Sequence, residues 1–150
     1  MENKNYLLFG LNDEFFGIDV DYVVRVIDLE KMMKIPKAPS FIAGAINMEG
    51  NVVPVVDLAK KIDLGETTIT EKTKCIILEI HHEDETMGVG VMIDAVHDVT
   101  EISQGETQPP PLENMGFDTH TLEGMFKSNE NFYMLINAVK VFEKELSSMI

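Results

Sequence analysis

The hydrophobic positions of this chain fall into short runs that are rich in β-branched and aromatic residues and are broken by Gly, Asn, Asp and Pro. This pattern is typical of β-strands joined by turns. Residues 6–11 and 15–18 predict a first hairpin, with its turn at 12–14. A helix should follow, because Asp19 suits an N-cap and the apolar residues after it have helical spacing, although they are β-branched, which also favours a strand. These residues are Val20, Val23, Val24 and Ile27.

The segment 35–39 (IPKAP) excludes a regular helix, since proline lacks the backbone donor. Beyond it, residues 45–48 and 52–58 predict two strands around a tight turn at Gly50 and Asn51, two residue types that tolerate a positive φ. Two further positions complete this region. Pro54 should occupy an edge strand or a bulge, and Asp57 should cap a short helix over 58–62.

Residues 73–80 and 87–99 predict a further hairpin with a polar tip at 81–86 (HHEDET). A linker is expected over 105–116, where three consecutive prolines favour an extended backbone. Residues 122–126 and 132–136 predict the last hairpin. Asn137 should then cap a closing helix with an apolar stripe of Val139, Phe142, Leu146 and Ile150.

These elements predict a mainly β protein with nine or ten short strands and two or three short helices. Hairpins at this spacing favour barrels or a sandwich. The two halves of the chain are loosely alike, each having hairpins followed by a small helical piece. The pattern is therefore compatible with two small barrels.

The composition of the chain argues against several classes of function. Of the 150 residues, 45% are hydrophobic, which suffices for a core, and the net charge of −14 argues against binding to nucleic acid or to an anionic membrane. The closest approach to a basic cluster is Lys31, Lys34 and Lys37, which we interpret as a solvated loop. The sequence has one cysteine, no signal peptide and no apolar run near the ~18 residues of a membrane helix, so we expect a cytoplasmic protein.

No catalytic, cofactor-binding or metal-binding constellation is evident. Cys75 lies within an apolar strand, where a thiol is far more often a small core hydrophobe than a nucleophile. His81 and His82 are neighbours on a predicted strand and should point to opposite faces, so a solvated hairpin tip is favoured over a metal site. A small β-barrel enzyme or ligand-binding protein that uses this acidic, His-rich loop remains the alternative from another class.

Residues 41–58 (FIAGAINMEGNVVPVVDL) resemble the signature of the chemotaxis coupling proteins, the CheW family, which typically reads FIxGxxNxRGxVVPVVDL. Further resemblance extends along the chain in the right order, through FFGIDVDYVVRVI, VGVMIDAVHDV, HTLEGMF and NFYMLINAVKVF. Each match is moderately specific, and together they cover nearly the whole chain.

The resemblance implies a single CheW-like domain over 1–150, made of two intertwined, five-stranded, SH3-like barrels packed side by side, with a few short helices. It also implies a non-enzymatic adaptor without cofactors, which couples the cytoplasmic tips of methyl-accepting chemoreceptors to the regulatory domain of the histidine kinase CheA within membrane-associated receptor arrays. Carried over to this sequence, the receptor-facing residues are Val23, Arg25, Gly44, Glu49 and Val99.

This chain departs from the family pattern at two of those positions. The family usually has Arg where Glu49 stands and Glu where Arg25 stands, so both signs are reversed. We expect the two side chains to face each other as a pair of swapped polarity, which bears more on partner choice than on stability. Gly44 is interpreted either as a site of close backbone approach or as a turn glycine, and Val23 and Val99 could equally be core residues.

Other binding roles stay open. The chain starts at Met1 and ends just after the closing helix, which favours a stand-alone adaptor over a module of a receiver-fused protein. A scaffold for a pathway other than motility has the same sequence features.

Overall fold

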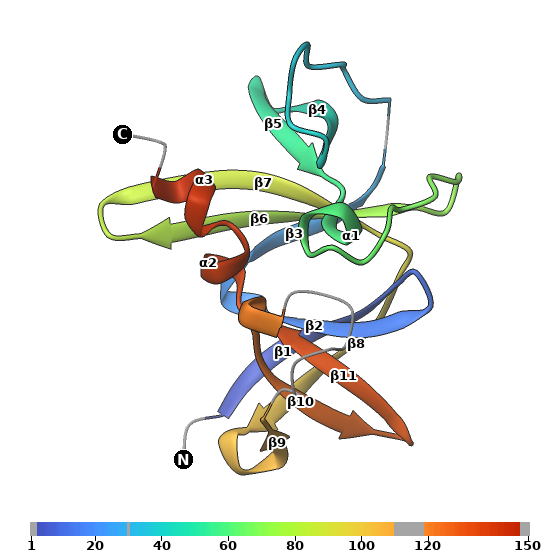
Figure 1. Ribbon diagram of the computed structural model, residues 1–150, viewed down its shortest axis with the longest axis vertical. Helices are drawn as coiled ribbons and strands as arrows, with labels where there is room; N and C mark the ends of the chain where they lie inside the picture. Colours follow the sequence, from blue (N-terminus) through green and yellow to red (C-terminus); the bar gives the residue numbers. More distant parts are fainter. Residues whose placement is uncertain (1–2, 30, 110–118, 148–150) are drawn as a thin grey trace.

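The computed structural model describes residues 3–29, 31–109 and 119–147. The described residues form two curled sheets, one of six strands and one of five, stacked along the long axis of the molecule (Figure 1). The six-stranded sheet has the order β8-β1-β2-β11-β10-β9, and the five-stranded sheet has the order β3-β6-β7-β5-β4. The predicted mainly β fold is therefore confirmed.

The chain builds the first two strands of one sheet, then the whole of the other sheet, and then returns. The six-stranded sheet comprises β1 (Asn3–Leu11), β2 (Glu14–Asp19), β8 (Ala95–Ser103), β9 (Thr107–Gln108), β10 (Leu122–Ser128) and β11 (Asn131–Ile136). The five-stranded sheet comprises β3 (Val23–Asp28), β4 (Ile42–Met48), β5 (Asn51–Val56), β6 (Lys74–His82) and β7 (Glu85–Ile93). Among described residues the strands number eleven, rather than nine or ten. The sequence predicted a helix where β3 lies, a single strand where β7 and β8 lie, and a linker where β9 lies.

The described residues form three hydrophobic clusters, and strand alternation assigns residues to them. On β1, Leu7 and Phe9 enter a large cluster that draws on both sheets and on the helices, while Tyr6 and Leu8 enter a smaller cluster inside the six-stranded sheet. A third cluster, which includes Cys75, fills the five-stranded sheet. Successive side chains of a strand point to opposite faces, so each sheet contributes to its own core and to the shared one.

Two of the predicted helix caps, Asp57 and Asn137, are confirmed. Asp57 precedes α1 (Leu58–Lys61), and its Oδ1 accepts a hydrogen bond from the backbone N–H of Lys60 at 3.3 Å. Asn137 precedes α2 (Ala138–Val141) and accepts from the Lys140 N–H at 3.0 Å. The closing helix is divided into α2 and α3 (Glu143–Ser147), on either side of Phe142.

The predicted apolar stripe of that helix is largely confirmed. Phe142 and Leu146 are buried in the shared cluster, and Val139 is half-buried against it. Ile150 lies outside the described residues. The closing segment therefore packs against the core that both sheets share, and covers one side of it.

The predicted helix after the first hairpin is wrong beyond one turn. The Asp19 carboxylate accepts from the Asp21 N–H at 2.9 Å and caps only a 3₁₀ turn, η1 (Val20–Tyr22). Residues 23–28 form β3 instead, which pairs antiparallel with β6. Tertiary pairing of the β-branched residues outweighed their helical spacing.

The single strand predicted over 87–99 is also wrong, because β7 and β8 belong to different sheets. The break is at Asp94, whose Oδ2 accepts from the Asn12 N–H at 2.8 Å and whose own N–H donates to the Gly10 carbonyl at 2.9 Å. These two hydrogen bonds hold the segment that passes from β7 to β8 against the turn of the β1–β2 hairpin.

The turn between β4 and β5 lies one residue earlier than predicted, at Glu49 (φ 53°) and Gly50 (φ 87°). Pro54 lies in an interior strand rather than at an edge. It is tolerated because β5 pairs with β7 only at Val55 and Val56, so no ladder hydrogen bond is required of residue 54 on that side.

The predicted linker at 105–116 begins within a 3₁₀ turn, η2 (Gln104–Glu106), and continues into the two-residue strand β9. Residues 110–116 of this prediction lie outside the described part of the chain. A third 3₁₀ turn, η3 (Thr119–Thr121), precedes β10. No helix in the described ranges is long and apolar enough to cross a membrane.

Candidate partner-binding surface

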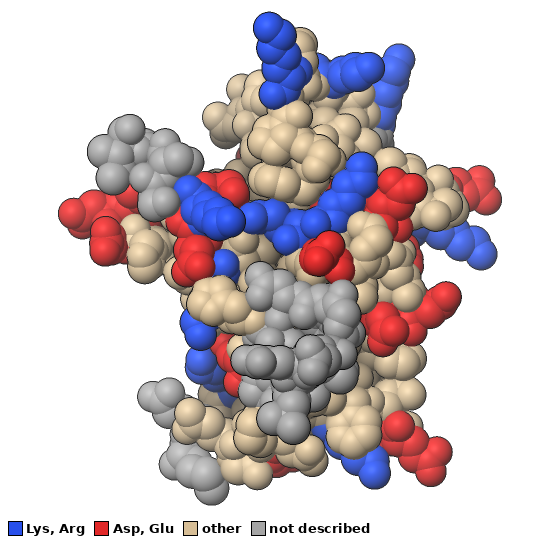
Figure 2. All heavy atoms as spheres, in the orientation of Figure 1, with Lys and Arg blue, Asp and Glu red and all other residues tan. Residues whose placement is uncertain are grey.

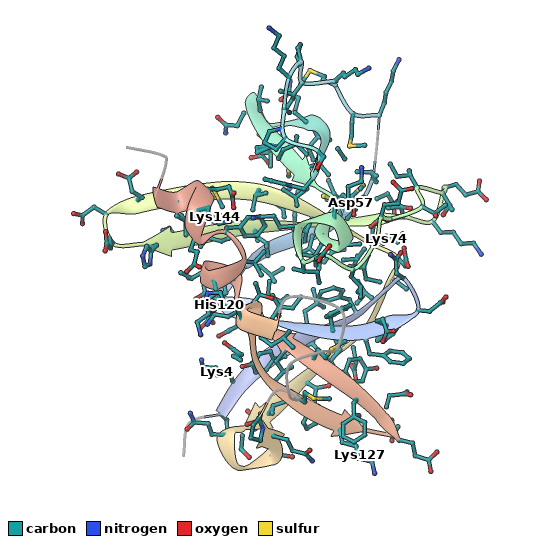
Figure 3. All side chains as sticks on the ribbon, viewed as in Figure 1. Lys4, Asp57, Lys74, His120, Lys127 and Lys144 are labelled. Carbon is teal, nitrogen blue, oxygen red and sulfur yellow. The ribbon has the colours of Figure 1, made fainter. Side chains whose placement is uncertain are left out.

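A groove of about 590 Å³ opens where the two sheets meet. Its apolar lining comes from β3 and β4 of the five-stranded sheet and from the start of β8 of the six-stranded sheet, and consists of Val26, Ile27, Ile46, Met48 and Val96. Its polar lining consists of Asp28, Asn47, Glu49 and Lys74, the last of which is labelled in Figure 3 at the start of β6.

The apolar lining is open to solvent at two strands. Val26 and Val96 are both exposed, whereas Ile27 and Met48 are half-buried and Ile46 is buried. An apolar groove with accessible valines and a polar rim is typical of a surface that binds another protein.

Two ion pairs form the rim. The Lys74 ammonium contacts the Asp28 carboxylate, and the Arg25 Nη2 lies 3.7 Å from the Glu49 Oε1. The predicted pairing of Arg25 with Glu49 is thus confirmed. Both pairs are solvated, so each contributes at most ~1 kcal/mol to stability. They set the charge pattern around the groove.

The five residues expected to face a receptor do not all gather at the groove. Glu49 lines it and Arg25 borders it through the ion pair. Val23 is half-buried against the shared core, and Gly44 is buried in β4. Val99 is exposed on β8, three residues beyond Val96, and does not line the groove.

Gly44 is a site of close approach, but the neighbour is this chain's own backbone. A Cβ at position 44 would lie 2.7 Å from the Met33 carbonyl oxygen and 2.9 Å from the Met32 Cβ. The interpretation of Gly44 as a turn residue is wrong, because it lies within β4 beside a register shift. Its role visible here is to let the 32–33 segment lie against β4.

The main lining residues that sequence reasoning missed are Val26, Ile46, Met48 and Val96. Val26 was missed because residues 20–27 were predicted to be a helix. It reaches the groove only as part of strand β3, which pairs with β6. Val96 comes from a distant part of the chain, and only the crossing at Asp94 brings it to β3 and β4.

The residues weighed for chemistry have structural surroundings. Burial raises the pKa of the Cys75 thiol to about 12, as expected of a core residue rather than a nucleophile. His81 Nδ1 lies 2.8 Å from Thr86 Oγ1, and its Nε2 lies 3.1 Å from Glu79 Oε1. Within the described residues, no group of three or more His, Cys, Asp or Glu side chains could hold a metal ion.

Comparison with known proteins agrees with this architecture. Residues 5–146 match the family model of the CheW-like domain. The chemotaxis protein CheW of Bacillus subtilis is 30% identical over 145 residues, covering 96% of this chain and 90% of that protein. CheW of Treponema pallidum is 25% identical over 149 residues, covering 99% and 88%. The crystal structure of the scaffolding protein TtCheW from Thermoanaerobacter tengcongensis superposes with a TM-score of 0.78 at 32% identity, covering 91% and 85%.

Proposed function

This chain belongs to the CheW-like family, and from that premise we propose that it is a non-catalytic adaptor that couples chemoreceptors to the histidine kinase CheA. It acts in the cytoplasm, as one CheW-like domain of two intertwined barrels, and is recruited to membrane-associated receptor arrays. Its partners are the regulatory domain of the kinase and the cytoplasmic tip of methyl-accepting receptors.

The groove between β3, β4 and β8 carries the receptor-binding half of this proposal. Its lining offers exposed valines to an apolar stripe on a partner, and its rim offers Glu49 and Arg25 as charged contacts. Val99, which is exposed three residues beyond Val96 on β8, offers a further apolar contact outside the groove. A receptor helix that lays apolar side chains in the groove would desolvate both valines.

Val23 and Gly44 support that surface indirectly. Val23 anchors the beginning of β3 on the shared core, and Gly44 lets the neighbouring loop lie against β4. Substitutions at these two positions would therefore alter binding through the position of β3 and β4. The reversed polarity of the Arg25–Glu49 pair should select a receptor whose own charges are matched to it.

Calorimetric titration tests the proposal. The full chain is titrated with a helical hairpin from a chemoreceptor tip of the same organism, and separately with the regulatory domain of that organism's CheA. We expect saturable 1:1 binding in both cases. Val26→Asp or Val96→Asp should weaken receptor binding by at least about tenfold, because a carboxylate would be buried in the apolar interface.

Val52→Asp is the matched control, since Val52 is 66% exposed on β5 and does not line the groove. It should leave the receptor affinity within about twofold. If Val52→Asp weakened receptor binding as much as Val26→Asp, the groove would not be the receptor site. If neither partner bound at high micromolar concentration, the adaptor role in chemotaxis would be rejected.

A further inference from the structure

The positive charge of this acidic chain is concentrated at one end. Residues 31–48 contain three lysines and no Asp or Glu, whereas the rest of the chain has nine basic and 26 acidic residues, a net charge of −17. The nearest acidic residues along the chain are Glu30 and Glu49. Figure 2 shows blue and no red side chains at the upper end, where the connection between β3 and β4 lies in Figure 1.

We name the segment 31–37 the basic tip. Its three lysines, Lys31, Lys34 and Lys37, are all exposed, and two large apolar side chains stand between them. Met33 is 47% exposed and Ile35 is 37% exposed. The tip therefore combines positive charge with accessible apolar area, which a merely solvated loop does not need.

The basic tip is held in place rather than hanging free. The Met33 N–H donates to the Ala45 carbonyl at 2.7 Å, and the Ala45 N–H donates to the Met33 carbonyl at 2.8 Å. Met32 packs into the core of the five-stranded sheet. A surface fixed in this way loses little conformational entropy when it binds a partner.

The described acidic residues that flank this segment along the chain, on β3 and in the β4–β5 turn, already form ion pairs with other residues. Asp28 pairs with Lys74, and Glu49 pairs with Arg25. Among the described residues, none of the three tip lysines forms an ion pair. Their charge is thus available to a partner.

We infer that the basic tip is a docking surface for an acidic protein segment that carries apolar side chains between its carboxylates. Charge complementarity selects the acidic segment, and Met33 and Ile35 select its apolar side chains. A short acidic segment fits better than an anionic membrane. A membrane surface is extended, so its negative charge would also be repelled by the net charge of −17 on the rest of the chain. The inference does not depend on what occupies the groove.

The test is an NMR titration of the ¹⁵N-labelled full chain with a blocked hexapeptide, Glu-Leu-Glu-Glu-Leu-Glu, at low and at physiological salt. We expect saturable shifts of the amides of residues 31–35, of Lys37 and of Ala45, which weaken as salt rises. The matched peptide Lys-Leu-Lys-Lys-Leu-Lys should leave these amides unshifted. A Met33→Ser, Ile35→Ser variant should bind the acidic peptide several-fold more weakly.

The charge contribution is isolated by two triple variants. Lys31→Glu, Lys34→Glu, Lys37→Glu should weaken binding by at least about tenfold. Lys72→Glu, Lys127→Glu, Lys140→Glu changes the net charge equally at exposed positions elsewhere and should leave affinity within about twofold. Equal melting temperatures would show that all variants are folded.

Three results would overturn the inference: no saturable shifts, shifts centred outside the tip, or equal loss in both triple variants. Phosphatidylglycerol vesicles serve as the competing probe. If they bound the chain through the same three lysines while the acidic peptide did not, the tip would be a membrane contact instead. Neither the kinase nor the receptor is used, so failure here leaves the coupling role untouched, and the reverse also holds.

Discussion

Cys75 is placed in the five-stranded sheet by packing against a glycine on the neighbouring strand. A Cβ added at Gly90 would lie 2.6 Å from the Cys75 Sγ, closer than two such atoms can approach. The other atoms near that Cβ, on Ile77 and Val55, lie at 3.4 and 3.6 Å and leave ordinary room. The thiol therefore fills the volume that Gly90 leaves open, which explains why a buried thiol stands on β6 without any chemistry.

We expect Gly90→Ala to destabilise the fold by ~1–3 kcal/mol, because the new methyl group forces the Cys75 side chain or β7 to move. In the double variant Gly90→Ala, Cys75→Ala, the added methyl takes the place of the lost sulfur. The double variant should then be more stable than the sum of the two single changes by ~0.5–2 kcal/mol. Urea unfolding of the four proteins measures this coupling.

Gly88 provides the control for that cycle. It lies on the same strand, and a Cβ there would meet nothing within 4 Å. Gly88→Ala should show no coupling to Cys75→Ala. Additive effects of Gly90→Ala and Cys75→Ala would mean that β7 moves away from the thiol as a unit.

Residue-scale features were predictable where the interaction is local. The caps at Asp57 and Asn137 depend on atoms three residues away, so the sequence pattern identified both. Asp57 also accepts hydrogen bonds from the Thr67 N–H and hydroxyl at 3.0 and 2.9 Å, and nothing in the local pattern indicates this second role. Figure 3 labels Asp57 beside α1.

At the scale of elements, the failures share one cause, which is pairing between distant segments. β3 was predicted as a helix because its apolar spacing fits both periods, and only its partner β6, about fifty residues later, decides in favour of a strand. The segment 87–99 is interrupted by Asp94, but nothing local to it shows that β8, which begins just after this residue, belongs to the other sheet. The groove lining that depends on these two strands was missed for the same reason.

The resemblance to a known family made part of the candidate site predictable despite this. Arg25 and Glu49 are 24 positions apart. The hydrophobic pattern predicted a helix where Arg25 lies on a strand, and placed the turn that contains Glu49 one residue too late. The positions carried over from the family nevertheless predicted the pair correctly. Whether Val23, Arg25, Gly44, Glu49 and Val99 contact a receptor stays a prediction.

The segment 31–35 is attached to β4 by the bridge between Met33 and Ala45. Gly44 lies beside this bridge and in close contact with the segment, so we call it the pivot on which the segment's position depends. We expect Gly44→Ala to displace this segment, because its Cβ would lie 2.7 Å from a backbone carbonyl oxygen that cannot rotate away. The cost should be ~1–3 kcal/mol. Hydrogen exchange of the Met33 and Ala45 amides, which form the bridge, should become at least tenfold faster.

Exchange in β6 separates a local effect from a general one. Amides of β6, which β7 and β5 separate from β4 in the sheet, should keep their protection in Gly44→Ala in the absence of denaturant. Unchanged exchange at Met33 and Ala45 would refute the pivot. Loss of receptor binding in this variant would then indicate direct contact at residue 44.

At the scale of the whole molecule, the shared cluster makes the two sheets interdependent. It contains Phe9 and Phe16 from the six-stranded sheet, whose rings lie 5.9 Å apart, and Ile76 and Val91 from the five-stranded sheet. Phe142 from the closing segment packs into the same cluster and is 2% exposed. A single core of this kind predicts that neither sheet is stable alone.

Phe142→Ala should therefore destabilise both sheets together, by ~3–5 kcal/mol, because it removes a large buried ring from their common core. Two probes report on the two sheets separately. Tyrosine fluorescence in a Tyr22→Phe background follows Tyr6 and Tyr133, which lie in the cluster of the six-stranded sheet. Pulse reaction of the Cys75 thiol at each urea concentration follows the five-stranded sheet, where the buried thiol is unreactive until that sheet opens.

Both unfolding midpoints should fall by the same amount in Phe142→Ala and should coincide with each other before and after the change. Phe132→Ala is the matched control, since its ring is 43% exposed on β11 and should shift either midpoint only slightly. If the thiol became reactive at a lower urea concentration than the tyrosines, the sheets would unfold in separate steps. A protein whose groove is built from both sheets would then lose its partner-binding surface before it lost its fold, because Val96 and Val26 would no longer be held together.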